Sequence, residues 1–131
     1  MTIKLSISAL IVLTLFLLFS GCSSTPTPAN LEIKPAPIHE INISYAKSNP
    51  PQVLVSIKGG LPDGCSKFHD VTSQVTGKTI DIKVTLERPR EAVCTAIYGY
   101  FDQTVNLGSN FIRGEIYTVN VNDQTTTFTM Q

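Results

Sequence analysis

The side chains most suggestive of catalysis lie in one short segment that contains Ser66, His69 and Asp70. Nucleophilic catalysis needs a serine within hydrogen-bond reach of a histidine, and a carboxylate on the other nitrogen of that ring. Side chains at these spacings on an extended segment do not converge in this way, and the sequence contains no Gly-x-Ser-x-Gly elbow. We therefore expect no catalytic residues, and we interpret the three as polar residues at the edge of a strand.

A metal site would have to draw on His39 and His69, with Glu40 or Asp70 as a further ligand. Structural zinc is held by four ligands at characteristic spacings, often including a Cys-x-x-Cys pair. The sequence contains no such pair, and the spacing of the two histidines predicts no shared site. We expect neither a metal nor a cofactor.

The beginning of the chain has a pattern that is typical of a targeting signal. Residues 5–19 form a mostly apolar run of 15 residues without a charge. A helix of this length, at 1.5 Å per residue, is shorter than a bilayer core of about 30 Å. The run is typical of the apolar region of a secretory signal peptide, and a spanning helix over residues 2–19 is the alternative.

The next four residues, Phe19-Ser20-Gly21-Cys22, resemble the lipobox of bacterial lipoproteins, in which Leu, a small residue and Gly or Ala precede the cysteine. Phe19 departs from the usual leucine. The resemblance implies that residues 1–21 are a signal peptide that is removed, and that Cys22 then carries the lipid that anchors the protein to a membrane. We expect an extended Ser/Thr/Pro-rich tether over residues 22–37 and a location in the bacterial cell envelope, on the extracytoplasmic side. An ordinary signal or anchor with an incidental cysteine is the alternative.

Cys65 and Cys94 remain once Cys22 is assigned to the lipid. Two cysteines in an exported domain predict a disulfide. The closed loop would hold 30 residues, for which the chain-entropy estimate is about 3.6 kcal/mol of stabilisation. A reactive or metal-binding thiol pair is the alternative.

Composition limits the size and the partners of the mature chain. Residues 22–131 are enough for one domain, and they carry 9 basic and 10 acidic residues. The sequence has no basic patch, so we expect no binding to nucleic acid.

Apolar and polar residues alternate through most of residues 38–131, and this period of two is typical of strands. The alternation predicts strands at 38–46, 52–58, 80–86, 98–107, 117–121 and 126–130, a turn at 59–64, a crossover at 88–91, and an irregular, bulged segment over 65–75. Asn122-Asp123 predicts a tight hairpin turn. About seven short strands without a confident helix predict an immunoglobulin-like antiparallel β-sandwich with one disulfide.

Several motifs in this region together resemble a class of small, largely uncharacterised bacterial secreted or lipoprotein domains with one cysteine pair. They are 60–65 (GLPDGC), 88–89 (RP), 93–95 (VCT), 105–108 (VNLG), and Gly114 with 117–122 (YTVNVN). The resemblance covers roughly residues 40–131. It implies an immunoglobulin-like fold and export, and it carries no catalytic residues.

Tyr98 and Tyr100 are the candidate interaction surface. On a strand they would face one side while Phe101 faces the other. Exposed tyrosines beside a glycine suit partner recognition; packing in the core or on a flank of the sandwich is the alternative. We expect a non-enzymatic binding or structural module, attached to the membrane through Cys22, whose candidate partner is an envelope protein.

Two other functions remain as alternatives. Asn49-Pro50, Gly59-Gly60 and Arg88-Pro89 faintly resemble, in this order, the loop motifs of chagasin-type inhibitors, small exported sandwiches that inhibit cysteine proteases through three loops at one end. The Thr-Thr-Gly part of that pattern is missing, and no aromatic residue follows Arg88-Pro89. The second alternative, an envelope enzyme, requires a convergent polar pocket, for which the sequence offers no basis.

Overall fold

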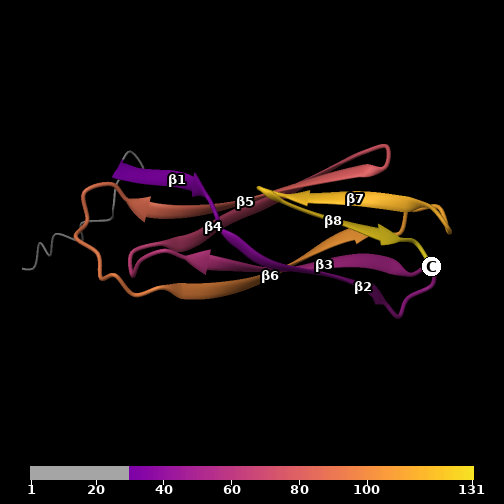
Figure 1. The fold of residues 1–131 in the computed structure, drawn as a ribbon, viewed down its shortest axis with the longest axis horizontal. Coiled ribbons are helices and arrows are strands. Elements are labelled where there is room, and N and C mark those ends of the chain that lie inside the picture. The colour runs from indigo at the N-terminus through magenta and orange to yellow at the C-terminus, as the bar shows by residue number, and fades with distance from the viewer. Residues whose placement is uncertain (1–29) are drawn as a thin grey trace, which may run out of the picture.

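The computed structural model of the chain describes residues 30–131; the expected signal peptide, Cys22 and residues 22–29 of the expected tether lie outside this part. Eight strands in the described part form two sheets that make a sandwich (Figure 1). They are β1 (Leu31–Pro35), β2 (Ile38–Ala46), β3 (Gln52–Leu61), β4 (Lys67–Thr76), β5 (Thr79–Pro89), β6 (Gly99–Gly108), β7 (Ile116–Val121) and β8 (Gln124–Thr129). Within residues 30–131, no helix is long and apolar enough to cross a bilayer.

The smaller sheet has the order β2-β3-β6, and both of its pairs are antiparallel. The larger sheet is built around β5. Along one edge of β5 lies β4, and the other edge is divided between two partners. Residues 79–82 pair in parallel with β7, which continues to β8, whereas residues 85–89 pair with β1 in the antiparallel sense.

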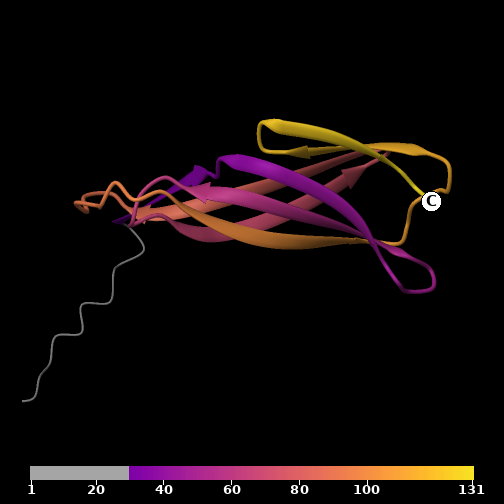
Figure 2. The same cartoon turned by 60° about the horizontal axis from the view of Figure 1, so that its bottom comes forward.

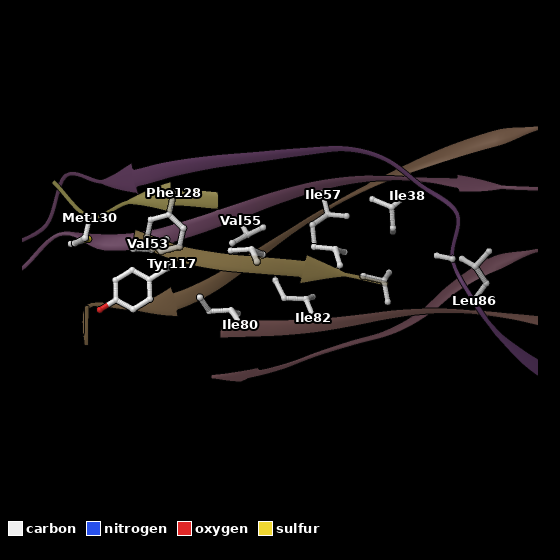
Figure 3. Close-up of a cluster of buried hydrophobic side chains, with 14 residues drawn as sticks. Ile38, Val53, Val55, Ile57, Ile80, Ile82, Leu86, Tyr117, Phe128 and Met130 are labelled. Atoms are coloured by element: carbon white, nitrogen blue, oxygen red, sulfur yellow. The ribbon is translucent and has the colours of Figure 1, made fainter. Parts of the chain in front are cut away.

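The core lies between the two sheets because each central strand turns every second side chain inward. The inward side chains of β3 and β5 are Val53, Val55, Ile57, Ile80, Ile82, Val84 and Leu86, and all of them are buried. Figure 3 shows those of β3 opposite those of β5, with Tyr117, Phe128 and Met130 gathered at one end and Leu86 toward the other. Branched aliphatic side chains suit this pleated surface, and each fully buried one contributes roughly 1.5–3 kcal/mol.

A side chain from the β7–β8 turn closes the divided edge of β5. Asn122 has a φ of 51°, in the left-handed region that Asn tolerates, as the predicted Asn-Asp hairpin requires. Its amide oxygen accepts from the backbone N–H of Val84 (3.0 Å), and its amide nitrogen donates to the carbonyls of Val84 (2.9 Å) and Ala36 (2.8 Å). Asn122 therefore joins β5, the β7–β8 turn and the chain that follows β1.

The expected β-sandwich with one disulfide is confirmed, and it has the two-sheet architecture of immunoglobulin-like domains. One detail of the prediction is wrong, because the β5–β7 pair is parallel. The described part has eight strands, which agrees with the prediction of about seven. The additional strand, β1, lies in the segment expected as tether, because Leu31 to Pro35 pair with Pro89 to Thr85. The sandwich thus begins at Leu31 and not at residue 38.

Parts of the expected turn and of the expected crossover also belong to strands. Gly59 to Leu61 continue β3, and Arg88 and Pro89 end β5. The irregular segment is the regular strand β4, apart from one bulge between Phe68 and Asp70, as the broken alternation indicated.

The sandwich is elongated, and its two ends are built differently (Figures 1 and 2). One end, which we call the disulfide end, holds residue 30, the turn at residues 62–66 and the loop at residues 90–98. The opposite end, which we call the aromatic end, holds the loops at residues 47–51 and 109–115 and the end of the chain. The candidate site residues lie at or near the disulfide end.

Candidate functional site

A covalent link holds the disulfide end together. Cys65 and Cys94 form the predicted disulfide, with their Cα atoms 5.5 Å apart. It joins the turn two residues before the start of β4 to the loop between β5 and β6, and the N–H of Gly64 donates to the carbonyl of Thr95 (2.9 Å). The carboxylate of Asp63 lies within 4.8 Å of both sulfurs, yet a disulfide offers a metal no thiolate. The bonded state thus leaves no reactive or metal-binding thiol pair here.

Asp63 organises the turn beside the disulfide. Its Oδ1 accepts from the backbone N–H of Cys65 (3.0 Å) and from both the backbone N–H (2.8 Å) and the hydroxyl (2.9 Å) of Ser66. Its Oδ2 lies 3.4 Å from Nε of Arg88, whose Nη2 is 3.5 Å from Sγ of Cys94. The Ser66 hydroxyl, the two backbone donors and the Arg88 charge hold the pKa of Asp63 below its ordinary value of 3.8.

The structure does not assemble the side chains most suggestive of catalysis. Ser66 is buried and donates to Asp63, whereas Nδ1 of His69 lies 3.1 Å from Oε2 of Glu87. Asp70 accepts from the N–H of Val71. Each of these side chains has a local partner, and together they form no nucleophile–base–acid sequence.

His39 and His69 are not brought together either. His39 belongs to β2 in the smaller sheet, and His69 belongs to β4 in the larger one. Within residues 30–131, the one grouping of three possible metal ligands is the disulfide with Asp63.

The two predicted surface tyrosines do lie side by side, together with His39. Tyr98 precedes β6 and Tyr100 belongs to it, and the two side chains are 44% and 60% exposed. Their ring centroids are 5.4 Å apart, and His39 contacts both edge-on, at 5.8 and 5.6 Å. Nε2 of His39 is 2.6 Å from the Tyr98 hydroxyl, and Nζ of Lys58 lies 5.6 Å from the centre of the Tyr100 ring. We call His39, Lys58, Tyr98 and Tyr100 the tyrosine patch.

Two consecutive glycines in β3 explain how aromatic rings pack against both faces of this sheet. A Cβ at Gly60 would overlap the Tyr98 hydroxyl and come within 2.8 Å of Nε2 of His39. A Cβ at Gly59, on the opposite face, would overlap the ring of Phe101. Gly60 therefore provides the floor of the tyrosine patch, while Gly59 lets Phe101 turn inward to pack against Phe68, at a centroid distance of 5.4 Å.

Sequence reasoning identified the tyrosines but missed their two partners in the patch, His39 and Lys58, and the floor of the patch at Gly60. The available signal was Gly-Gly at the end of an alternating segment. A glycine in a strand often marks a position where another group approaches closely. Reading residues 59–64 as a turn hid this signal, because the pairing of Gly60 with Tyr100 appears only when β3 is extended to Leu61.

The motifs that resemble chagasin-type inhibitors do not meet. Asn49-Pro50 lies in the loop at the aromatic end, Arg88-Pro89 ends β5 at the disulfide end, and Gly59-Gly60 lies within β3. The three segments therefore cannot form three neighbouring loops at one end.

A hollow of about 860 Å³ lies beside the divided edge of β5. It is lined by parts of β4, β5 and the β7–β8 turn, including Asp81, Lys83 and Asn122. Asp81 accepts from the side-chain amide of Asn120 (2.8 Å), and Asn122 is fully engaged in joining strands. The described lining residues of the hollow include neither histidine nor cysteine.

Comparison with known proteins places the domain. A family model described as "ORF11 beta-sandwich domain" matches residues 55–130, which run from within β3 to the end of β8 and include both disulfide cysteines and Tyr98 and Tyr100. Two proteins of Herpetosiphon aurantiacus, named as uncharacterized 10.2 kDa proteins in the HgiBIM and HgiEIM 5' regions, are each 46% identical over 76 residues, which cover 58% of this chain and 92% of theirs. A third, in the HgiCIIM 5' region of the same organism, is 41% identical over 86 residues, or 66% of this chain and 90% of its own. No solved structure matches the chain. The chain belongs to the ORF11 beta-sandwich domain family.

Proposed function

We propose that this protein is a lipid-anchored lipoprotein of the bacterial cell envelope, and that its sandwich is a non-enzymatic binding module that recognises an envelope partner through the tyrosine patch. The observation that carries the binding role is the patch itself. Its rings are exposed, yet they are held in place by one another and by the floor at Gly60. Rigid tyrosines that keep a polar tip are common anchors of protein interfaces.

The surroundings of the patch suit a protein partner. Opposite Lys58 lie Glu40 on one neighbouring strand and Asp102 on the other, so charges of both signs surround the rings. An aromatic centre within a polar rim is the usual anatomy of a protein interface.

The pairing of the cysteines supports the anchoring role. Cys65 and Cys94 bond to each other, which leaves Cys22 as the third cysteine of the chain, directly after Phe19-Ser20-Gly21. Disulfides persist in oxidising compartments, and this favours the extracytoplasmic side of the membrane. A lipid with at least two acyl chains on Cys22 would hold the domain firmly at the surface.

The anchor is tested by the intact mass of the protein from native membranes, measured with and without reduction and alkylation. We expect a chain that begins at a lipidated Cys22, in which Cys65 and Cys94 resist alkylation until they are reduced. A chain that retains residues 1–21, with an unmodified Cys22, would overturn the anchored role.

The binding role is tested by placing a photo-crosslinking amino acid at Tyr100 in cells. We expect one discrete cross-linked product there and none from the same group at Val75, which is 50% exposed on β4. Gly60→Ala should abolish the product, because its Cβ displaces Tyr98 and His39. Gly99→Ala is the matched control, since its Cβ would meet Leu61 at an ordinary 3.5 Å. Equal cross-linking at Tyr100 and Val75, or no effect of Gly60→Ala, would contradict recognition through the patch.

A further inference from the structure

The loop at residues 90–98 is an unusual apolar surface. It follows β5 directly, and its side chains Val93 and Ile97 are 102% and 69% exposed. No described residue covers Val93. An exposed valine or isoleucine is unremarkable when it stands alone, whereas two on one loop, with Tyr98 next in sequence, suggest a contact surface.

This loop is also anchored rigidly. Cys94 lies between the two aliphatic residues and is bonded to Cys65, and Thr95 accepts from the N–H of Gly64. The loop is therefore attached to the sandwich at its centre as well as at both ends. A loop held in this way can present apolar side chains without losing much conformational freedom when they are buried.

The same loop touches the place where the described chain begins. The N–H of Arg90 donates to the carbonyl of Asn30 (3.0 Å), and Nε of Arg90 donates to the carbonyl of Leu31 (3.3 Å). Figures 1 and 2 show the start of β1 and this loop at the same end of the sandwich. Whatever is attached to the chain just before Asn30 is thereby attached at the start of this loop, three residues before Val93.

Cys22 lies only eight residues before Asn30. A chain of that length spans at most about 28 Å when fully extended. Strand β3, with ten residues, extends about 33 Å along the sandwich. A lipid on Cys22 therefore keeps the disulfide end close to the bilayer, and the aromatic end can approach the bilayer only if the domain tips over.

We propose that residues 93–97 of this loop form a membrane-contact surface, whose Val93 and Ile97 enter the interfacial region of the bilayer in which Cys22 is anchored, while Tyr98, at the end of the loop, belongs to the tyrosine patch. This inference rests on the proposed lipid anchor. Two aliphatic side chains alone would hold a protein to lipid only weakly, but the tether makes their insertion intramolecular and so raises their local concentration. The contact would orient the domain, with the tyrosine patch on its side face left open to a partner.

The neighbouring charges indicate that insertion is driven by the apolar side chains. Arg90 and Glu91, which are consecutive and exposed, carry opposite charges. A surface of mixed sign gains little from anionic lipid headgroups, so the contact should change little with ionic strength.

The test uses tryptophan fluorescence, because the natural chain contains no tryptophan. Val93→Trp and Ile97→Trp place the probe on the loop, and Ile112→Trp and Ile116→Trp are matched controls, 68% and 61% exposed, at the aromatic end. Each full-length variant is purified from bacterial membranes in its lipidated form and placed in vesicles of phosphatidylethanolamine and phosphatidylglycerol. Brominated lipids then quench only a probe that enters the bilayer.

We expect emission at positions 93 and 97 to shift to shorter wavelengths and to be quenched several-fold more than at positions 112 and 116. Ile97→Asp in the Val93→Trp background should reduce the quenching, whereas Ile116→Asp in the same background should not. Retention of the disulfide and of the far-UV spectrum shows that each variant is folded.

Equal, weak quenching at all four positions in a chain with a lipidated Cys22 would overturn the membrane contact and leave the anchor intact. A blue shift at position 93 without lipid quenching would overturn it in favour of contact with a second copy of the chain, since the vesicles contain no other protein. An intact mass without lipid on Cys22 would overturn the anchor, and the membrane contact with it.

Discussion

The two ends of the sandwich hold their loops by different means. At the disulfide end, none of the described side chains of residues 90–98 is buried, and the loop is held by Cys94, by backbone hydrogen bonds and by Arg88. At the aromatic end, Phe111 packs edge-on against Tyr117 and Phe128, with centroids 4.9 and 5.7 Å apart. The loop of residues 90–98 is therefore held in place without buried side chains, which leaves its apolar side chains free to contact another surface.

At the aromatic end, hydrogen bonds add to the packing of the aromatic rings. The Tyr117 hydroxyl accepts from the N–H of Ile112 (2.9 Å), and the N–H of Gly114 donates to the carbonyl of Met130 (2.8 Å). At the disulfide end, the turn and the loop are instead linked by the disulfide, and Asp63 of the turn pairs with Arg88 at the end of β5. Apolar packing at one end and a disulfide at the other thus both hold a loop in place. The disulfide does so while leaving the apolar side chains of its loop exposed.

The largest effect should come from removing an aromatic ring at the aromatic end. Phe128 is 7% exposed and stacks on Tyr117 at 5.4 Å. We expect Phe128→Ala to lower the free energy of unfolding by about 4 kcal/mol, because a buried ring is replaced by a cavity. Urea denaturation measures this loss, with Val75→Ala on exposed β4 as the control that should change stability by less than about 0.5 kcal/mol. Similar values for the two variants would refute the packing account.

Removing the disulfide should cost slightly less but should act at the other end. Cys65→Ser together with Cys94→Ser opens a loop of 30 residues, and we expect a loss of about 3.5 kcal/mol. Amide exchange should accelerate at residues 90–98, while the N–H of Ile112, which donates to Tyr117, should remain protected. Equal acceleration at both ends would show that the ends are not independent.

Asn122, midway between the ends, should have an intermediate effect. Asn122→Gly keeps the left-handed turn but removes three hydrogen bonds, and we expect a loss of about 2 kcal/mol. Asn122→Ala should cost about 1 kcal/mol more, because alanine resists a positive φ. Denaturation of both variants separates the two contributions. If Asn122→Gly were as stable as the natural protein, the amide would not join the strands.

Much of the sandwich could be predicted from the sequence because period-two alternation reports which face of a strand is buried. Ile80, Ile82, Val84 and Leu86 showed it most clearly, and all four are buried. Strand β1 escaped prediction although its sequence, LEIKP, alternates apolar and polar residues, because it is short and its proline was interpreted as part of the Ser/Thr/Pro-rich tether. The parallel β5–β7 pair escaped because register between distant strands depends on the whole fold and leaves no local pattern.

The candidate site could be predicted only for the residues that lie on one continuous segment. Tyr98 and Tyr100 were correctly expected to share one side of a strand, opposite Phe101. His39 and Lys58 come from two other strands, and their contacts depend on the register that pairs Gly60 with Tyr100. The disulfide was predictable because, with Cys22 set aside, only two cysteines remained to pair.

The smallest effect should appear as a difference in pH response between the two ends. The hydrogen bonds from Ser66 and the backbone hold the pKa of Asp63 below 3.8. A carboxyl whose pKa is lowered by folding stabilises the protein above its unfolded pKa and loses that contribution as pH falls through the lower, folded value. Asp63→Asn should therefore reduce the loss of stability between about pH 5 and pH 2, and Ser66→Ala should raise the Asp63 pKa toward its ordinary value.

The aromatic end should respond in the opposite pH range. Lys78, at the β4–β5 turn, donates to Glu115, and this contact raises the lysine pKa above 10.5. A lysine whose pKa is raised by folding stabilises the protein below its unfolded pKa and loses that contribution as pH rises through the higher, folded value. Carbon NMR titration of the two side chains checks both directions. Acid should loosen the disulfide end first, and strong base should loosen the aromatic end first. If Asp63 titrated at or above 3.8, the turn beside the disulfide would not depend on the charge of this carboxylate.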